Sequence, residues 1–247
     1  MNASFYRKKF NKYGYIKLKN IFSKNIINKI IEDIYSAKNV KKYYDQNNLI
    51  RRIEMIYDKG SDLRNANKKI KNLLKKIFGK DFLIFKDKFN AKPVGGEGFF
   101  AHYDGIFEFK DKKKKIKNGW YEYTSEFINV LTALDNCTKK NGTIEVSNAH
   151  QNNFEKLLQN TNIDGTPNIK KSILRKLKFK QINLNIGDIL IFKNTCPHRS
   201  KKNNSKKSRK TLYYTYTLSE YGSYYKKYFN DKKTSLNKNS KSLNGEV

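Results

Sequence analysis

The sequence predicts a mainly β protein with flanking helices, arranged as a sandwich or jelly roll. Many short strand-like segments follow one another, and Gly, Asn and Asp turns separate them. Amphipathic helical segments precede them, and 247 residues suffice for one domain with a substantial core. We expect residues 1–235 to form this single domain and residues 236–247 to form a polar, flexible C-terminal tail.

The first part of the chain predicts three helices and one short strand. Residues 4–13 and 23–38 are helical candidates, and in the second segment isoleucines repeat at helical spacing. We interpret this isoleucine stripe as core packing rather than as an interaction face. Residues 15–18 alternate like a strand, and residues 66–78 predict a further amphipathic helix that ends at a glycine.

Several later segments predict short strands. They are rich in β-branched and aromatic residues and have turn residues at their ends. These segments are residues 82–92, 98–104, 127–135, 143–147, 179–183, 188–193 and 211–218. Asn141 and Gly142 lie between two of them, where glycine suits a tight turn.

Three side chains form a candidate metal site. His102 and Asp104 make an H-x-D pair, and His198 lies far downstream. Two imidazoles and one carboxylate on one face of a metal form the facial triad of non-haem Fe(II) oxygenases, which leaves positions open. The chain has only three histidines, and two of them fall in this pattern. The alternative, that these histidines are hydrogen-bonded or surface residues spaced so by chance, stays open from the motif alone.

An arginine follows the distal histidine at a distance that suits the same chemistry. Arg209 lies on a predicted strand after His198. Beside a metal, its guanidinium can hold the far carboxylate of 2-oxoglutarate through a bidentate pair.

Around these residues the chain resembles the phytanoyl-CoA dioxygenase family. The resemblance is carried by residues 93–104, 131–146 and 187–216, and it extends over most of the chain. It implies a double-stranded β-helix, the cupin-like form of the jelly roll. It also implies an oxidoreductase that uses Fe(II), 2-oxoglutarate and O2 to hydroxylate a C–H bond.

The resemblance implies a role for each candidate residue. His102, Asp104 and His198 would hold Fe(II). Retention of Asp104 favours hydroxylation, because related halogenases lack this carboxylate. The tight turn at Asn141 and Gly142 is interpreted as purely structural.

The co-substrate would be bound by three further side chains. Arg209 would anchor the 5-carboxylate of 2-oxoglutarate, and Ser200 would add a hydrogen bond there. Lys88 would pair with the other carboxylate, with Lys86 as the alternative.

Several segments look most like the branch of the family that hydroxylates small organophosphonates, such as 2-aminoethylphosphonate or an N-methylated form. They are residues 51–54, 85–90, the Gly-rich approach to His102 and residues 224–232. The chain departs from the pattern at Tyr103, where many relatives carry glutamine, and in the lysine-rich segment 110–115. The alternative substrate is an amino acid, a lipid or a carrier-bound intermediate in biosynthesis.

Three residues are candidates for substrate contact. Arg51 and Arg52 suit the oxygens of a phosphonate, or else they form a structural salt bridge with Glu54. Trp120 could cover the site or surround a quaternary amine, or it could pack at the rim.

A formal net charge of +31 at pH 7 is the main competing observation. Such a charge favours nucleic acids or membrane surfaces, because lysines displace counterions from phosphates. However, the lysines are spread along the chain with many asparagines and isoleucines, as in proteins encoded by AT-rich genomes. We therefore expect an anionic small molecule as the partner, steered by the positive field, and keep a basic nucleic-acid-binding module as the remaining alternative.

The expected location is the cytoplasm. Cys137 and Cys196 are too few for a disulfide framework, and no apolar run is long enough to span a bilayer. The first ten residues lack the apolar core of a signal peptide.

Overall fold

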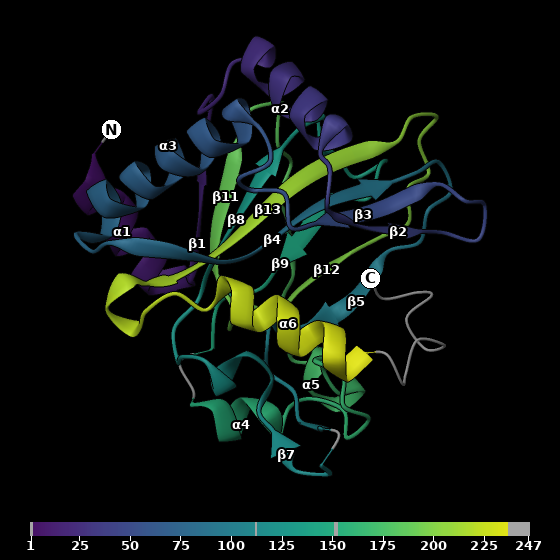
Figure 1. Cartoon of the computed structure of the whole chain (residues 1–247). Coiled ribbons are helices and arrows are strands. Elements are labelled where there is room, and N and C mark those ends of the chain that lie inside the picture. Colours follow the sequence, from purple (N-terminus) through teal and green to yellow (C-terminus); the bar gives the residue numbers. More distant parts are fainter. Residues whose placement is uncertain (1, 112, 151–152, 237–247) are drawn as a thin grey trace.

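The computed structural model describes residues 2–111, 113–150 and 153–236, and two antiparallel sheets face each other within this part of the chain (Figure 1). The larger sheet contains β1 (Tyr15–Leu18), β2 (Lys41–Tyr44), β3 (Ile50–Glu54), β4 (Phe82–Lys92), β8 (Ile128–Ala133), β11 (Ile189–Lys193) and β13 (Arg209–Leu218). Its spatial order is β1-β11-β8-β13-β4-β3-β2.

The smaller sheet completes the sandwich. It contains β5 (Phe99–His102), β9 (Ile144–Val146), β10 (Lys180–Gln181) and β12 (His198–Ser200), in the order β10-β9-β12-β5. A separate hairpin joins β6 (Phe109–Lys110) to β7 (Ile116–Lys117). Many non-consecutive strands are neighbours, so segments far apart in sequence meet at the same end of the sandwich.

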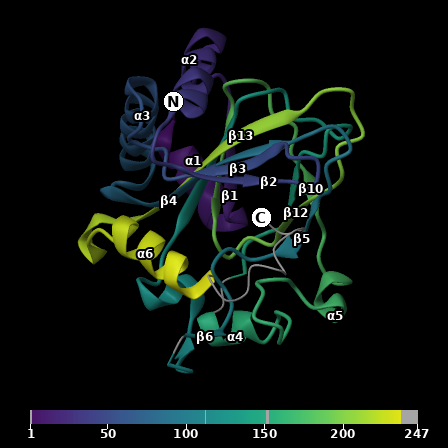
Figure 2. The ribbon, with the colours of Figure 1, turned by 45° about the vertical axis from the view of Figure 1, so that its right-hand side comes forward.

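Three N-terminal helices lie against the outer face of the larger sheet (Figures 1 and 2). They are α1 (Ala3–Tyr13), α2 (Lys24–Ser36) and α3 (Ser61–Phe78). The isoleucine stripe of α2 is core packing, as predicted, because Ile27, Ile30 and Ile34 are fully buried. Each such side chain contributes about 1.5–3 kcal/mol through burial.

Helix α3 begins earlier than the predicted start at residue 66. Its first turn is capped from another helix, since the carboxylate of Asp33 accepts hydrogen bonds from the backbone N–H groups of Asp62 and Leu63. A cap supplied from a distant part of the chain leaves no local sequence pattern at the helix start, so the periodicity alone placed the boundary too late.

Among the described residues, three further helices lie in the second half of the chain. They are α4 (Phe154–Leu158), α5 (Lys171–Leu174) and α6 (Tyr225–Leu236), with 3-10 turns at Gly119–Glu122 and Ser219–Tyr221. Helix α6 extends to Leu236, so the last residues of the predicted domain are helical. The predicted tail lies, from residue 237 on, outside the described residues. No helix in the described part of the chain is both long and apolar enough to cross a membrane.

The space between the sheets is apolar on one side and cationic on the other. Leu131, Leu190 and Phe192 of β8 and β11 pack against Val146 of the smaller sheet. On β4, by contrast, every second residue from Lys86 to Lys92 points between the sheets, while the intervening residues face the helices. The polar half of the interior therefore follows from the alternation of one long strand.

A β-bulge on β4 adjusts this alternation. Thr215 of β13 pairs with Lys86, and the next residue, Tyr216, pairs with Ile84, so Phe85 is the extra residue. As a result Phe85 packs on Trp120 and Lys86 also points inward.

Candidate active site

A cavity of about 320 Å³ opens between the sheets at their cationic side. His102, Asp104 and His198 line it, and so do the candidate co-substrate residues Arg209 and Ser200. Its volume is at the lower end of ligand pockets, which suits a small substrate beside a small co-substrate.

The three candidate metal ligands converge in this cavity. One ligand atom from each of His102, Asp104 and His198 lies within 4.8 Å of the others. His102 and His198 face each other in the register of β5 and β12. Asp104 follows β5 rather than lying on it, contrary to the predicted strand 98–104, and its backbone N–H donates to the carbonyl of Asn194.

Both imidazoles are held with one nitrogen free for a metal. His102 Nδ1 lies 2.7 Å from the carbonyl of Phe100, and His198 Nδ1 lies 3.0 Å from that of Cys196. A protonated Nδ1 donates to each carbonyl, which leaves the Nε2 lone pair directed at the cavity. Burial, followed by the neighbouring His198, lowers the pKa of His102 to about 3, so a proton does not compete for this lone pair.

The carboxylate of Asp104 is oriented by an amide. Asn129 Nδ2 donates to Asp104 Oδ2 at 2.9 Å, and Thr215 Oγ1 in turn donates to Asn129 Oδ1 at 2.8 Å. Burial alone would raise the pKa of Asp104, but His198 and Lys88 hold it below its ordinary value. Two neutral imidazoles and an ionised carboxylate fit a divalent ion such as Fe(II).

Asn129 was not predicted as a site residue. It lies on β8, which the sequence predicted as an ordinary strand, and its role appears only when β8 packs beside the turn that carries Asp104.

Arg209 is a buried cation that lines the cavity. It is 4% exposed, its Nε has no hydrogen-bond partner, and its Nη1 is 3.5 Å from Thr211 Oγ1. No described carboxylate forms a salt bridge with it. An unpaired buried guanidinium of this kind is suited to an anionic group of a ligand.

Ser200 lines the same cavity as Arg209 and keeps a free proton. Its Oγ accepts from Lys92 Nζ at 2.8 Å and from the backbone N–H of Phe99 at 3.2 Å. The hydroxyl proton therefore remains available to a ligand. Lys92 also donates to the carbonyls of Gly142 and Lys201, and burial, followed by Arg209, lowers its pKa to about 7.

Lys88 also lines the cavity, between the metal ligands and β13. Its Nζ lies 4.8 Å from the centre of the Tyr213 ring and donates no hydrogen bond within the described chain. Burial, followed by Arg52, lowers its pKa to about 7. The predicted alternative, Lys86, lines the same cavity, and its Nζ lies 4.7 Å from the ring centre of Trp120.

Arg52 and Lys232 form a positive wall supported by one buried carboxylate. Glu54 is fully buried, and Lys232 Nζ of α6 lies 2.6 Å from each of its oxygens. Arg52 Nη1 is 3.4 Å from Glu54 Oε1, while its Nε has no partner. The predicted salt bridge with Glu54 and the exposure of Arg52 to the cavity are therefore both present.

Arg51 does not line the cavity. Its guanidinium donates to the carbonyls of Ala91 and Glu97, each at 3.3 Å, so it connects β3 to the segment before β5. Trp120 forms part of the cavity wall, where it is 5% exposed and packs on Phe85 and Phe127.

Tyr103 points away from the metal ligands. It is fully buried in a separate apolar cluster, and its hydroxyl is 2.7 Å from His150 Nδ1. Gly142 has a positive φ of 68°, and a Cβ there would meet the carbonyl of Lys201, which explains glycine at this turn.

Sequence comparisons find related proteins over most of the chain. The family model described as phytanoyl-CoA dioxygenase matches residues 10–211. A 2-aminoethylphosphonate dioxygenase of an uncultured bacterium is 26% identical over 200 residues, which are 80% of this chain and 70% of that protein. A methylphosphonate hydroxylase of Gimesia maris is 28% identical over 161 residues, which are 65% of this chain but only 55% of that protein.

The fold is also that of solved oxygenases. The crystal structure of EctD from S. alaskensis with 2-oxoglutarate and 5-hydroxyectoine superposes with a TM-score of 0.66 at 15% identity. The match covers 89% of this chain and 79% of EctD. The predicted double-stranded β-helix is thereby confirmed.

Proposed function

The chain belongs to the phytanoyl-CoA dioxygenase family, and on this premise we propose that it hydroxylates a C–H bond of a small organophosphonate. Fe(II) is the metal, and 2-oxoglutarate and O2 are the co-substrates. In the overall reaction, R–H, 2-oxoglutarate and O2 give R–OH, succinate and CO2, so atoms and electrons balance. When bound, the metal and co-substrates supply the oxidising chemistry.

The residues of the chain bind and orient the reactants. We assign His102, Asp104 and His198 to the metal, because their free lone pairs converge. We assign Arg209 and Ser200 to the 5-carboxylate of 2-oxoglutarate, since one offers an unpaired guanidinium and the other a free hydroxyl proton.

Lys88 is assigned to the other carboxylate of the co-substrate. It lies among the groups that interact electrostatically with Asp104, at the metal end of the cavity, and donates no hydrogen bond in the described chain.

The observation that carries the phosphonate assignment is the excess of cations in the cavity. Arg209 and Lys88 are assigned to 2-oxoglutarate, and the cavity-lining Arg199 is paired with Glu145 at 2.7 Å, so Arg52, Lys86 and Lys232 remain. Asp104 is the one acidic residue among the described cavity-lining residues. The single carboxylate of Glu54 behind the wall cannot balance three cations, so a dianion completes the site.

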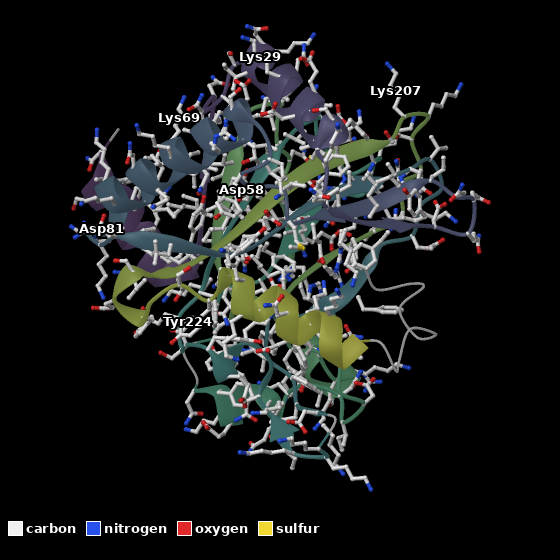
Figure 3. All side chains as sticks on the ribbon, in the orientation of Figure 1. Lys29, Asp58, Lys69, Asp81, Lys207 and Tyr224 are labelled. Carbon is white, nitrogen blue, oxygen red and sulfur yellow. The ribbon has the colours of Figure 1, made fainter. Side chains whose placement is uncertain are left out.

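The phosphonate assignment is also favoured over the biosynthetic alternative. The two similar proteins named above act, by name, on phosphonates. The small cavity leaves little room for a carrier-bound or lipid substrate inside the protein. The lysines are not confined to the site: Lys29, Lys69 and Lys207 project from separate outer parts of the molecule (Figure 3).

The test is succinate release from 2-oxoglutarate under air with added Fe(II) and ascorbate. Methylphosphonate, 2-aminoethylphosphonate and its N-methylated forms would be offered as substrates. We expect at least one phosphonate to stimulate turnover in the wild type and none to do so in His198→Ala.

A second variant probes the anion site. Arg52→Met should raise the KM for the phosphonate at least about tenfold, because a charge-assisted hydrogen bond contributes about 1.5–3 kcal/mol. Lys29→Met, which removes an exposed lysine on α2, serves as the matched control. Turnover of 2-oxoglutarate without stimulation by any phosphonate would refute the substrate assignment and leave the biosynthetic alternative.

A further inference from the structure

An aromatic corner of the cavity holds a lysine of the chain itself. Lys86 Nζ lies 4.7 Å from the ring centre of Trp120 and 5.3 Å from that of Tyr228. Two aromatic faces around one ammonium group form a cation–π box. We name Trp120 and Tyr228 the aromatic box.

The aromatic box is rigid and preformed. Trp120 packs on Phe85 and Phe127, with ring centres 5.5 and 5.3 Å apart, and Tyr228 packs on Phe85 at 4.7 Å. The bulge at Phe85 directs both the Phe85 ring and the Lys86 side chain inward. Lys86 is therefore held in the box by the backbone of β4.

Lys86 is a buried lysine that contacts aromatic rings rather than a hydrogen-bond acceptor of the protein. Lys86 is 7% exposed, and no hydrogen bond or salt bridge of its Nζ is present in the described part of the chain. Burial lowers the pKa of Lys86, whereas the carboxylates of Glu54 and Asp104 favour its charged form. Arg52 and Lys232 lie in the same wall of the cavity, and their shared partner is Glu54.

We propose that Lys86 acts as a built-in ammonium group which determines substrate specificity: it fills the aromatic box and restricts the site to phosphonates without an amino group. This inference rests on the proposed function and names the substrate class of that site. A 2-aminoethylphosphonate would have to place its ammonium beside Lys86, Arg52 or Lys232. Among the described cavity-lining residues the only carboxylate is that of Asp104, which is a proposed metal ligand. An alkylphosphonate dianion carries no ammonium group that would have to lie beside these cations.

The first test uses Trp120 as a reporter, since it is the only tryptophan in the chain. Its fluorescence would be followed while tetramethylammonium is added to protein loaded with Fe(II) and 2-oxoglutarate in the absence of O2. In Lys86→Ala the box is empty, and we expect a saturable change at a concentration at least about tenfold lower than in wild type.

Lys29→Ala is the matched control, because it shortens an exposed lysine on α2 that does not line the cavity and leaves the box closed. It should respond like the wild type. Equal responses of wild type and Lys86→Ala would overturn the assignment of Lys86 to the box, whether or not the protein acts on phosphonates.

The second test is the ratio of kcat/KM for methylphosphonate to that for N-trimethylated 2-aminoethylphosphonate. We expect a ratio above about ten in wild type, and a fall of at least about tenfold in that ratio in Lys86→Ala. Lys86→Met keeps the packed stem and removes only the charge, so the ratio should fall in this variant as well, even if Lys86→Ala folds poorly.

The outcomes separate the inference from the function on which it rests. A wild type that prefers the amino-substituted phosphonate would overturn the role of Lys86 while leaving the phosphonate function in place. Failure of every phosphonate to stimulate turnover would overturn the function, and with it the substrate class inferred here, even if tetramethylammonium still reports on the box.

Discussion

Replacing Arg209 with methionine should leave the ligand-free protein as stable as before and remove its response to 2-oxoglutarate. Arg209 is buried, its Nε has no partner, and its charged neighbours include Lys92 and Arg51, which carry the same sign. Without a ligand, the guanidinium therefore bears a desolvation cost that no described carboxylate offsets. Methionine keeps a stem of similar length and avoids this cost.

The size of the effect can be estimated. With 2-oxoglutarate at about 100 times its Kd, the wild type gains about 2.7 kcal/mol of stability. For a domain of this size, about 2–4 °C of Tm accompanies each kcal/mol, which gives a rise of about 5–11 °C. Loss of a charged hydrogen-bond pair raises the Kd about 10- to 150-fold. If the Kd rises about 100-fold, the same ligand concentration stabilises the variant by only about 0.4 kcal/mol, or about 1–2 °C.

The assay is thermal unfolding of Fe(II)-loaded protein without O2, with and without 2-oxoglutarate. Arg51→Met is the matched control, since Arg51 lies on β3, separated from β13 by β4, and does not line the cavity. It should retain the full shift in Tm. An undiminished shift in Arg209→Met would refute the role of Arg209 as the anchor, and a large loss of ligand-free stability would refute the view that its charge is uncompensated.

Three further predictions concern groups around the site. Glu54→Gln should lower the free energy of unfolding by about 3–5 kcal/mol in urea titrations, because it leaves Lys232 without its buried carboxylate; an unchanged midpoint would contradict this. Asn129→Ala should weaken Fe(II) binding about 10- to 100-fold in metal titrations, because Asp104 loses the amide that orients it, whereas equal affinity would show that this hydrogen bond is dispensable. Lys92 has a pKa lowered to about 7 in the folded protein, while an unfolded lysine titrates near about 10.4. Between these values the unfolded chain binds more protons, so stability should rise with pH from about 7 to about 10, and it should rise less in Lys92→Met.

The candidate ligands could be predicted from sequence because their chemistry is rare in this chain. Two of only three histidines take part in the triad, and the pattern around them resembles one family. The isoleucine spacing likewise predicts α2, since it is a local feature of the sequence. The strands β2 and β3 were not predicted, because their lysines, arginines and tyrosines give no clean alternation of apolar and polar residues.

The wall of the substrate pocket could not be predicted in the same way. Glu54 and Lys232 are 178 residues apart, and only the packing of α6 beside β3 brings them together. The bulge at Phe85 shifts the alternation of β4 by one residue. In a regular strand Phe85 and Lys86 would point to opposite faces, so the sequence pattern alone does not direct both inward. Both features depend on tertiary packing rather than on local sequence.

The alternation of β4 limits how the substrate range of such an enzyme can evolve. Removal of one codon between the bulge and Lys92 would exchange the two faces of the rest of the strand. Lysines would then enter the apolar layer under the helices, and Phe89 would enter the cavity. A change of substrate along this strand can therefore proceed by replacement of single residues, whereas gain or loss of residues is confined to the loops, where no register is at stake.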